Sequence, residues 1–215
     1  MDLEPTYGFL IVKTFARLYR DYVTDYGLKK DFYALPRLDK TPEEYRIQYR
    51  GLHRDALNDY EDSELPAEIR MAELAESERC WDGFLFRLDD ALEVFELLGE
   101  SKPHYELVWS RTAGSGRRPP AGFAAIGHEP SWFAGDHFSA LCDCMVIPRW
   151  HGTDVDGTLF LDHFRRLNQH GLFSTAHEAT EFLDYYLSFD WTERGDFLCA
   201  EVFIPETPER RPHDV

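Results

Sequence analysis

No stretch of this sequence is apolar for long enough to cross a membrane, so we expect no spanning helix. The first ten residues hold no basic segment ahead of an apolar run, and we expect no secretory signal. Cysteine is also scarce, with four in 215 residues. A chain of this length that is not exported has no need of a disulfide framework. We therefore predict reduced thiols and a cytoplasmic protein.

Several motifs that define common enzyme classes are absent as well. The sequence has no phosphate-binding loop, no dinucleotide fingerprint and no serine elbow, and it gives no reason to expect a cofactor. Positive charge is in short supply, because 23 Lys and Arg face 40 Asp and Glu, a net charge of −17. Such a balance repels nucleic acid and anionic membrane surfaces and favours basic partners. We expect a basic protein partner and no direct contact with nucleic acid or membrane.

Apolar and aromatic side chains, by contrast, are plentiful at 43% and 15% of residues, enough for a sizeable core. Hydrophobic periodicity predicts helices over 5–27, 41–60, 84–98, 156–169 and 175–189, with a short one from Pro66. A strand over Tyr7–Phe15 competes with the first helix, since β-branched and aromatic residues gather there. Alternation predicts strands over 104–111, 121–127, 137–148 and 197–205.

These elements predict an α+β fold: a helical N-terminal half packed on a small, mostly antiparallel sheet with two further helices, as a single globular unit. We expect an acidic helical half over residues 1–100, an α+β half over 101–206 and a flexible tail over 207–215. In the helix over 84–98 the buried stripe is predicted to be Phe84, Leu88, Leu92 and Phe95. The helix over 175–189 opens with a capping box, Thr175 to Glu178.

Negative charge is concentrated in residues 55–100, where fifteen carboxylates face three arginines, a balance of −12. On amphipathic helices these carboxylates are expected to lie on the solvent side. The ordinary interpretation is a solvated helix surface, and the functional one is a docking surface for a basic protein. The acids that we assign to such a surface are Glu61, Asp62, Glu64 and Glu68.

The densest collection of reactive side chains lies between His128 and His163, with four histidines, two cysteines and two tryptophans. Tryptophan and arginine are the residue types that anchor interfaces, and histidine titrates near neutral pH. We therefore predict that Trp132, Arg149, Trp150 and His151 contact a partner. The alternative is that the loop carrying Trp150 closes the edge of the core.

The predicted strand over 137–148 offers two further kinds of site. Cys142 and Cys144 point to the same side of a strand, and with His137 and His151 they are able to form a Cys₂His₂ zinc site. Buried thiols are the simpler interpretation, because the spacing is not that of zinc knuckles. Asp143 lies on the opposite side, where a carboxylate either fixes a loop or an arginine or acts as a general acid, base or ligand.

Residues 154–159 read DVDGTL, which resembles the nucleophile motif of the haloacid-dehalogenase-like phosphatases. The resemblance implies that Asp154 is the nucleophile, that Asp156 is the acid/base and that magnesium bridges them. It covers six residues only. The family requires an apolar strand before the motif and a lysine after it, whereas here Pro-Arg-Trp-His-Gly-Thr precedes the first aspartate and no lysine follows. We interpret both aspartates as residues that favour the positive end of the next helix.

Three functions follow, and we rank them. The first is an acidic, cytoplasmic protein-binding module that inhibits or regulates a basic partner, as a toxin-immunity protein does. The second is a metal-dependent hydrolase that uses Asp143, His151, Asp154 and Asp156. The third is a nucleic-acid mimic that uses the same acidic surface as the first.

Overall fold

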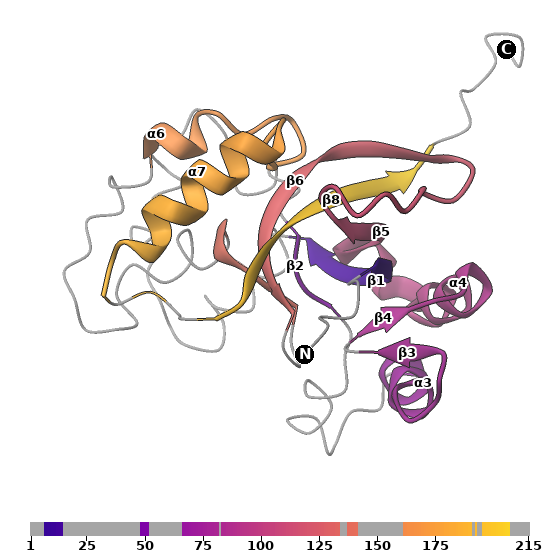
Figure 1. The fold of residues 1–215 in the computed structure, drawn as a ribbon. Coiled ribbons are helices and arrows are strands. Elements are labelled where there is room, and N and C mark those ends of the chain that lie inside the picture. The colour runs from indigo at the N-terminus through magenta and orange to yellow at the C-terminus, as the bar shows by residue number, and fades with distance from the viewer. Residues whose placement is uncertain are drawn as a thin grey trace, which may run out of the picture.

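A computed structural model of the chain describes residues 7–14, 48–51, 66–81, 83–133, 137–141, 161–190, 192 and 195–206. Within these ranges the fold is α+β (Figure 1). The helices are α3 (Pro66–Ala75), α4 (Leu88–Leu97), the 3₁₀ helix η4 (Gly99–His104), α6 (Leu161–Phe164) and α7 (Ala176–Leu187). The strands are β1 (Tyr7–Thr14), β2 (Gln48–Gly51), β3 (Cys80–Trp81), β4 (Phe84–Leu85), β5 (Tyr105–Thr112), β6 (Phe123–Phe133), β7 (His137–Ser139) and β8 (Phe197–Pro205).

The strands form one antiparallel sheet in the order β3-β4-β1-β5-β8-β6-β7, and β2 also pairs with β1. The last strand, β8, is therefore inserted between β5 and β6, which are consecutive along the chain. Figure 1 shows β6 and β8 curving side by side, with α6 and α7 near one end of the sheet and α3 and α4 near the other. Strands from both predicted halves of the chain thus belong to one sheet.

The helix predicted over 5–27 is wrong over its described part, because Tyr7–Thr14 is strand β1. Its residues pair with β5 from Tyr7 opposite Arg111 to Lys13 opposite Tyr105. Since β1 is buried on both sides, its unbroken apolar run satisfies a helical pattern as well as a strand pattern. The competing strand is the correct prediction.

The helix predicted over 41–60 is also wrong where the structure describes it. Gln48–Gly51 is strand β2, which pairs with the end of β1. The remaining residues of that prediction, and residues 15–27, lie outside the described ranges, as does the tail over 207–215. The helical character predicted for the N-terminal half therefore holds only for α3 and α4 among the described elements.

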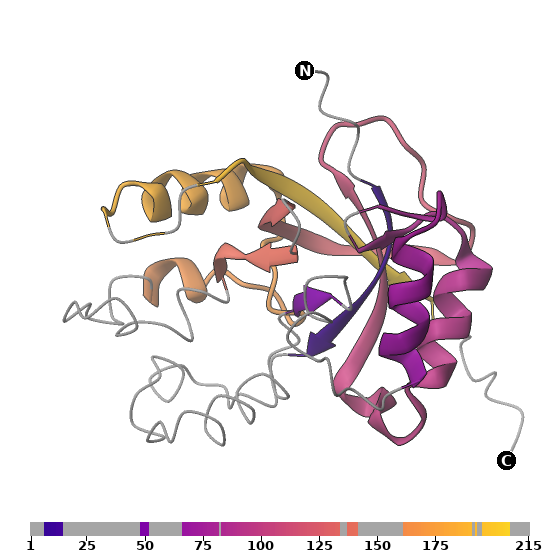
Figure 2. The ribbon, with the colours of Figure 1, turned by 90° about the horizontal axis from the view of Figure 1, so that it is seen from below.

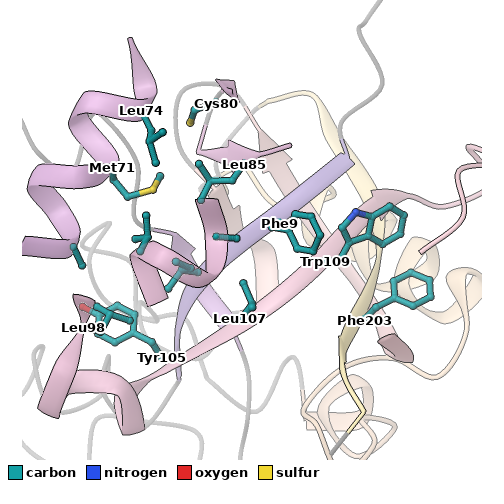
Figure 3. Packing of buried hydrophobic residues seen from close by; sticks show 14 residues of the cluster. Phe9, Met71, Leu74, Cys80, Leu85, Leu98, Tyr105, Leu107, Trp109 and Phe203 are labelled. Carbon is teal, nitrogen blue, oxygen red and sulfur yellow. The ribbon is translucent and has the colours of Figure 1, made fainter. Parts of the chain in front are cut away.

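Two apolar clusters pack on opposite sides of the sheet. The first joins Phe9 and Ile11 of β1 to Leu107 and Trp109 of β5 beneath α3 and α4 (Figure 3). Tyr105 belongs to it too, which confirms the predicted alternation along β5. The second cluster takes the alternate residues, among them Leu10, Val12, Val108 and Val202. Each of these large side chains contributes roughly 1.5–3 kcal/mol through burial, so both sides of the sheet stabilise the fold.

Helix α4 begins four residues later than predicted, and its buried side differs in part from the predicted one. Phe84 belongs to β4, while the helix turns Asp90, Ala91 and Val94 inward and leaves Leu92 42% exposed. Small residues on the inward side let the helix approach the sheet closely. A hydrophobic pattern that is dominated by large apolar residues does not identify this side of the helix. Of the predicted stripe, only Leu92 is exposed; Phe84 is buried in β4, and Leu88 and Phe95 are partly buried against the first apolar cluster.

The C-terminal elements follow their local signals more closely. Strands β5 and β8 and helix α7 form where they were predicted, whereas β6 was predicted over 121–127 and extends to Phe133. Thr175 caps α7, because its side chain accepts from the Glu178 N–H at 3.2 Å and the Glu178 carboxylate accepts from the Thr175 N–H at 3.2 Å. Two predictions run too long: the helix over 156–169 ends at Phe164, and the strand over 137–148 ends at Ser139, after which Ala140 and Leu141 are helical and buried.

A β-bulge in β6 receives the loop that precedes α7. Gly127 has φ +152°, and a Cβ built there would lie 2.7 Å from Leu172 Cβ and 2.8 Å from the Phe173 carbonyl oxygen. Asn168 holds the same loop, since its Nδ2 donates to the Ile126 carbonyl at 2.8 Å and its Oδ1 accepts from the His170 N–H at 2.8 Å. Only glycine permits this close approach of loop and strand.

Among the helices in the described ranges, none is both long and apolar enough to traverse a bilayer.

Candidate interaction surface

Most of the predicted site residues lie outside the described ranges, and the structure does not place them. They are Glu61, Asp62, Glu64, Cys142, Asp143, Cys144, Arg149, Trp150, His151, Asp154 and Asp156. Three predicted residues are described. Trp132 lies in β6, where its backbone pairs with Phe197 of β8, and His137 begins β7. Glu68 lies in the first turn of α3.

Glu68 does not face solvent as expected of a docking residue. Its side chain is 6% exposed, on the inward side of α3 with Ala67 and Met71. Asp90 of α4 is buried too, beside Arg79 at 3.2 Å and Arg87 at 3.8 Å. The expectation that the carboxylates of this segment all lie on the solvent side is therefore wrong for two of them. Both fall on the side of a helix that packs against the core, and Asp90 holds the β3–β4 hairpin to α4.

The outward side of α4 combines carboxylates with large apolar side chains. Asp89, Glu93 and Glu96 are exposed there, and they recur at the spacing of neighbours on one helix surface. Leu92 and Leu97 lie among them and are 42% and 39% exposed. Isolated exposed leucines are ordinary, but two exposed leucines on the acidic side of one helix are typical of an interaction surface.

Helix α3 continues this surface beside α4 (Figure 2). Its outward residues include Ile69, which is 51% exposed, and Glu73, and the exposed Glu76 follows directly after the helix. Arg70 joins the two helices: its Nε donates to Glu93 at 3.1 Å and its Nη1 to Glu73 at 3.0 Å, and these hydrogen bonds raise the pKa of Arg70. We call the surface made of these outward residues the α3–α4 face; it comprises Ile69, Glu73, Glu76, Asp89, Leu92, Glu93, Glu96 and Leu97.

The α3–α4 face keeps a negative balance despite its ion pairs. Five carboxylates lie on it, and among the described cations Arg70 pairs with Glu73 and Glu93, Arg87 with Asp89, and Lys102 with Glu96. The Arg87–Asp89 separation is 3.8 Å with both groups well exposed, which makes it a weak pair. Lys102 pairs with Glu96 and lies 5.7 Å from the centre of the Phe95 ring. A basic partner therefore meets carboxylates that are only partly neutralised.

Two features of the titratable side chains bear on catalysis and metal binding, namely whether they converge and whether their pKa values are perturbed. No group of three or more His, Cys, Asp or Glu side chains converges among the described residues. Burial raises the pKa of the Cys199 thiol to about 11, so this thiol is a poor nucleophile. Burial, and then the nearby Arg166, lower the pKa of His163, which stacks on Tyr185 at 5.0 Å between ring centroids. Both residues support the packing of α7 and not a reaction.

Sequence reasoning located the acidic segment but missed the apolar part of the α3–α4 face. Leu92 was assigned to the core, and Leu97 and Ile69 were not assigned at all. The one available signal was that Asp89, Glu93 and Glu96 lie on the same helical side as Leu92 and Leu97.

Comparison with protein-family models, with curated proteins and with solved structures found no match to this chain.

Proposed function

We propose that the chain is a protein-binding module that acts in the cytoplasm and inhibits or regulates a basic partner through its α3–α4 face. The observation that carries the proposal is the outward side of α4, where Leu92 and Leu97 are exposed among Asp89, Glu93 and Glu96. Apolar groups surrounded by charge are the composition of an interface centre and its rim. A helix surface that only contacts water is explained by the carboxylates alone, and the exposed leucines have no role in it.

The two kinds of residue contribute differently to binding. Covering an exposed leucine contributes on the order of 1 kcal/mol, since part of that side chain is already buried. The carboxylates mainly steer a cationic partner and exclude others, so they raise the association rate and make it sensitive to salt. A stable interface buries about 800 Å² on each side. The contacts predicted for Trp132, Arg149, Trp150 and His151 stay a separate prediction, because Trp132 lies in β6 beside β7 and the other three residues lie outside the described ranges.

A toxin-immunity protein is the concrete form that we favour, because inhibitors of that class have to match positively charged clefts. A nucleic-acid mimic would use the same face. Competition with DNA distinguishes the mimic, which requires a partner that binds DNA and is displaced from it by the chain.

Site-specific photo-cross-linking tests the proposal. Benzoylphenylalanine is placed at Leu92 on the α3–α4 face and, as a matched control, at Asp184, which is exposed on α7. In the cells to which the chain is native, we expect a basic protein to be captured from the first position and not from the second. Capture of no protein, or of the same proteins from both positions, contradicts the proposal.

Binding by the captured protein is then measured with purified components. Leu92→Ser and the double substitution Asp89→Ala with Glu96→Ala are each expected to weaken binding by about tenfold, the second mainly through a slower association rate. Asp184→Ala is expected to leave the affinity unchanged. Equal affinities for all variants, or an affinity insensitive to salt, would show that the face does not form the interface.

A further inference from the structure

The loop between β5 and β6 carries two cations that form no ion pair with any described carboxylate, in a chain with a net charge of −17. Seven other described cations each lie within 4.0 Å of a carboxylate: Arg70, Arg79, Arg87, Lys102, Arg111, Arg165 and Arg166. Arg117 and Arg118 are exposed and, among the described side chains, form no ion pair. Their charge is therefore available to a ligand.

The backbone of this loop is held in place from several sides. Arg111 is fixed by Glu201, to which its Nε donates at 2.8 Å, and it lies over the Phe203 ring at 5.3 Å. Its Nη1 donates to the carbonyl of Arg117. The two ends of the loop also hydrogen-bond to the strand region around β8, from the Ala113 N–H to the Cys199 carbonyl and from the Glu206 N–H to the Gly122 carbonyl. The loop is anchored and does not need a ligand to order it.

The Arg117 side chain is oriented as well. Its guanidinium carbon lies 4.0 Å from the centroid of the Tyr7 ring, at the start of β1, so its flat side is covered by an aromatic ring. A guanidinium stacked in this way keeps its N–H edge for a planar acceptor. Tyr7 in turn lies 6.0 Å from the ring of Phe86, which is 40% exposed. An oriented cation thus adjoins an exposed apolar surface.

We propose that Arg117, Tyr7 and Phe86, with Arg118 beside them, bind an acidic segment of a protein partner, with a carboxylate against the Arg117 guanidinium and an apolar side chain against Phe86. A carboxylate offers two coplanar oxygens that match the fork of arginine. The strong negative charge of the whole chain disfavours ligands with many phosphates, such as nucleic acid, more than a segment with one or two carboxylates. The site has the opposite charge to the α3–α4 face and does not depend on the function proposed for it.

Nuclear magnetic resonance of the full chain with ¹⁵N-labelled arginine side chains tests the proposal. The probes are the blocked peptide acetyl-Glu-Phe-Glu-Phe-amide, the same peptide with Gln for Glu, and inorganic phosphate. We expect a saturable shift of the Arg117 Nε–H resonance with the glutamate peptide. The other two probes should bind with an affinity at least about fivefold lower, which is the effect expected when a charged hydrogen bond is lost. The resonance of Arg165, which pairs with Asp162 at 3.0 Å, serves as the internal control.

Variants separate the site from general charge attraction. Arg117→Gln should abolish saturable binding, and Arg117→Lys should weaken it about tenfold because an ammonium neither stacks on Tyr7 in the same way nor binds a carboxylate through two parallel hydrogen bonds. Phe86→Ser should weaken binding of the glutamate peptide but not of phosphate. Arg165→Gln should leave the affinity for both probes unchanged. The proposal is overturned by the absence of a saturable shift, by equal shifts at Arg165, or by phosphate binding as tightly as the glutamate peptide.

Discussion

The helical layer around α7 and the helical layer formed by α3 and α4 differ in how much of their apolar surface is buried. Around α7 the large side chains are covered: His163 and Phe173 each pack against Phe182, and Tyr186 packs on Phe197 of β8. The four large apolar residues that the described chain leaves exposed are Ile69, Phe86, Leu92 and Leu97, all in or beside α3 and α4. The α7 layer is complete by itself, whereas the α3–α4 layer retains apolar surface that does not contribute to folding.

Truncating one apolar residue in each layer tests this difference most strongly. Phe182 is fully buried in α7, and Phe182→Ala should lower the free energy of unfolding by about 3–5 kcal/mol through lost burial and an unfilled cavity. The matched change in the other layer, Leu92→Ala, should alter it by no more than about 0.5 kcal/mol. Urea denaturation of both variants provides the measurement. Similar losses in the two would remove the distinction.

The contact between the α6–α7 loop and β6 should be almost as sensitive. Gly127→Ala places a Cβ against Leu172 and Phe173, and we expect a loss of about 2–4 kcal/mol. Gly116→Ala is the control, because Gly116 also has a positive φ of +72° but no neighbour within 4 Å, so backbone strain alone costs about 1 kcal/mol. Thermal unfolding distinguishes the two. A Gly127→Ala variant no less stable than Gly116→Ala would show that the close approach is unimportant.

Loss of the N-cap should have a smaller effect confined to α7. Thr175→Ala removes the acceptor for the Glu178 N–H, at an expected cost of about 1 kcal/mol. Thr180→Ala, in the middle of the same helix, should be neutral or slightly stabilising because alanine has the higher helix propensity. The comparison is made by denaturant unfolding, and equal losses for the two threonines would argue against the cap.

The smallest predicted effect is a dependence of stability on pH through His163. Burial and Arg166 lower the pKa of this imidazole in the folded chain, so the unfolded chain takes up the proton first as the pH falls. The contribution of His163 is fully present above the unfolded pKa near 6.5 and is lost as the pH falls toward the lower folded pKa. Between pH 7.5 and pH 5 the wild type should therefore lose more stability than His163→Gln, as measured by thermal unfolding at each pH. Parallel curves would exclude His163 as the source.

The sequence predicted some elements of the fold well, and the reason is physical. Helix α7 and strand β8 carry their signals within a few residues, as a capping box at Thr175 and as a run bounded by Pro205. Strand β1 was ambiguous because the burial of both its sides depends on β4, β5 and the clusters above and below. The inward side of α4 was predicted only in part, because Leu88 and Phe95 pack on the core as expected whereas Ala91 lies inward in place of Leu92.

The candidate sites show the same limit. The amino-acid composition revealed the acidic segment. The packing of α3 and α4 on the sheet decides which of its carboxylates face solvent, and Glu68 was misassigned for that reason. The cluster of Arg117 with Tyr7 was not predicted, because it depends on the register that places Tyr7 opposite Arg111 across two strands more than ninety residues apart in sequence. Such proximity has no local signature.

The insertion of β8 between β5 and β6 has a consequence for synthesis. While the ribosome is still adding residues before Phe197, β5 and β6 have no shared partner, and each presents an open backbone edge that can join another chain. The two groups of strands join only after β8 has emerged, so assembly of the described sheet waits for residues 197–205. In a nascent chain that stalls before that point, β5 and β6 belong to two separate groups of paired strands. A chaperone would have to shield the open edges of both groups.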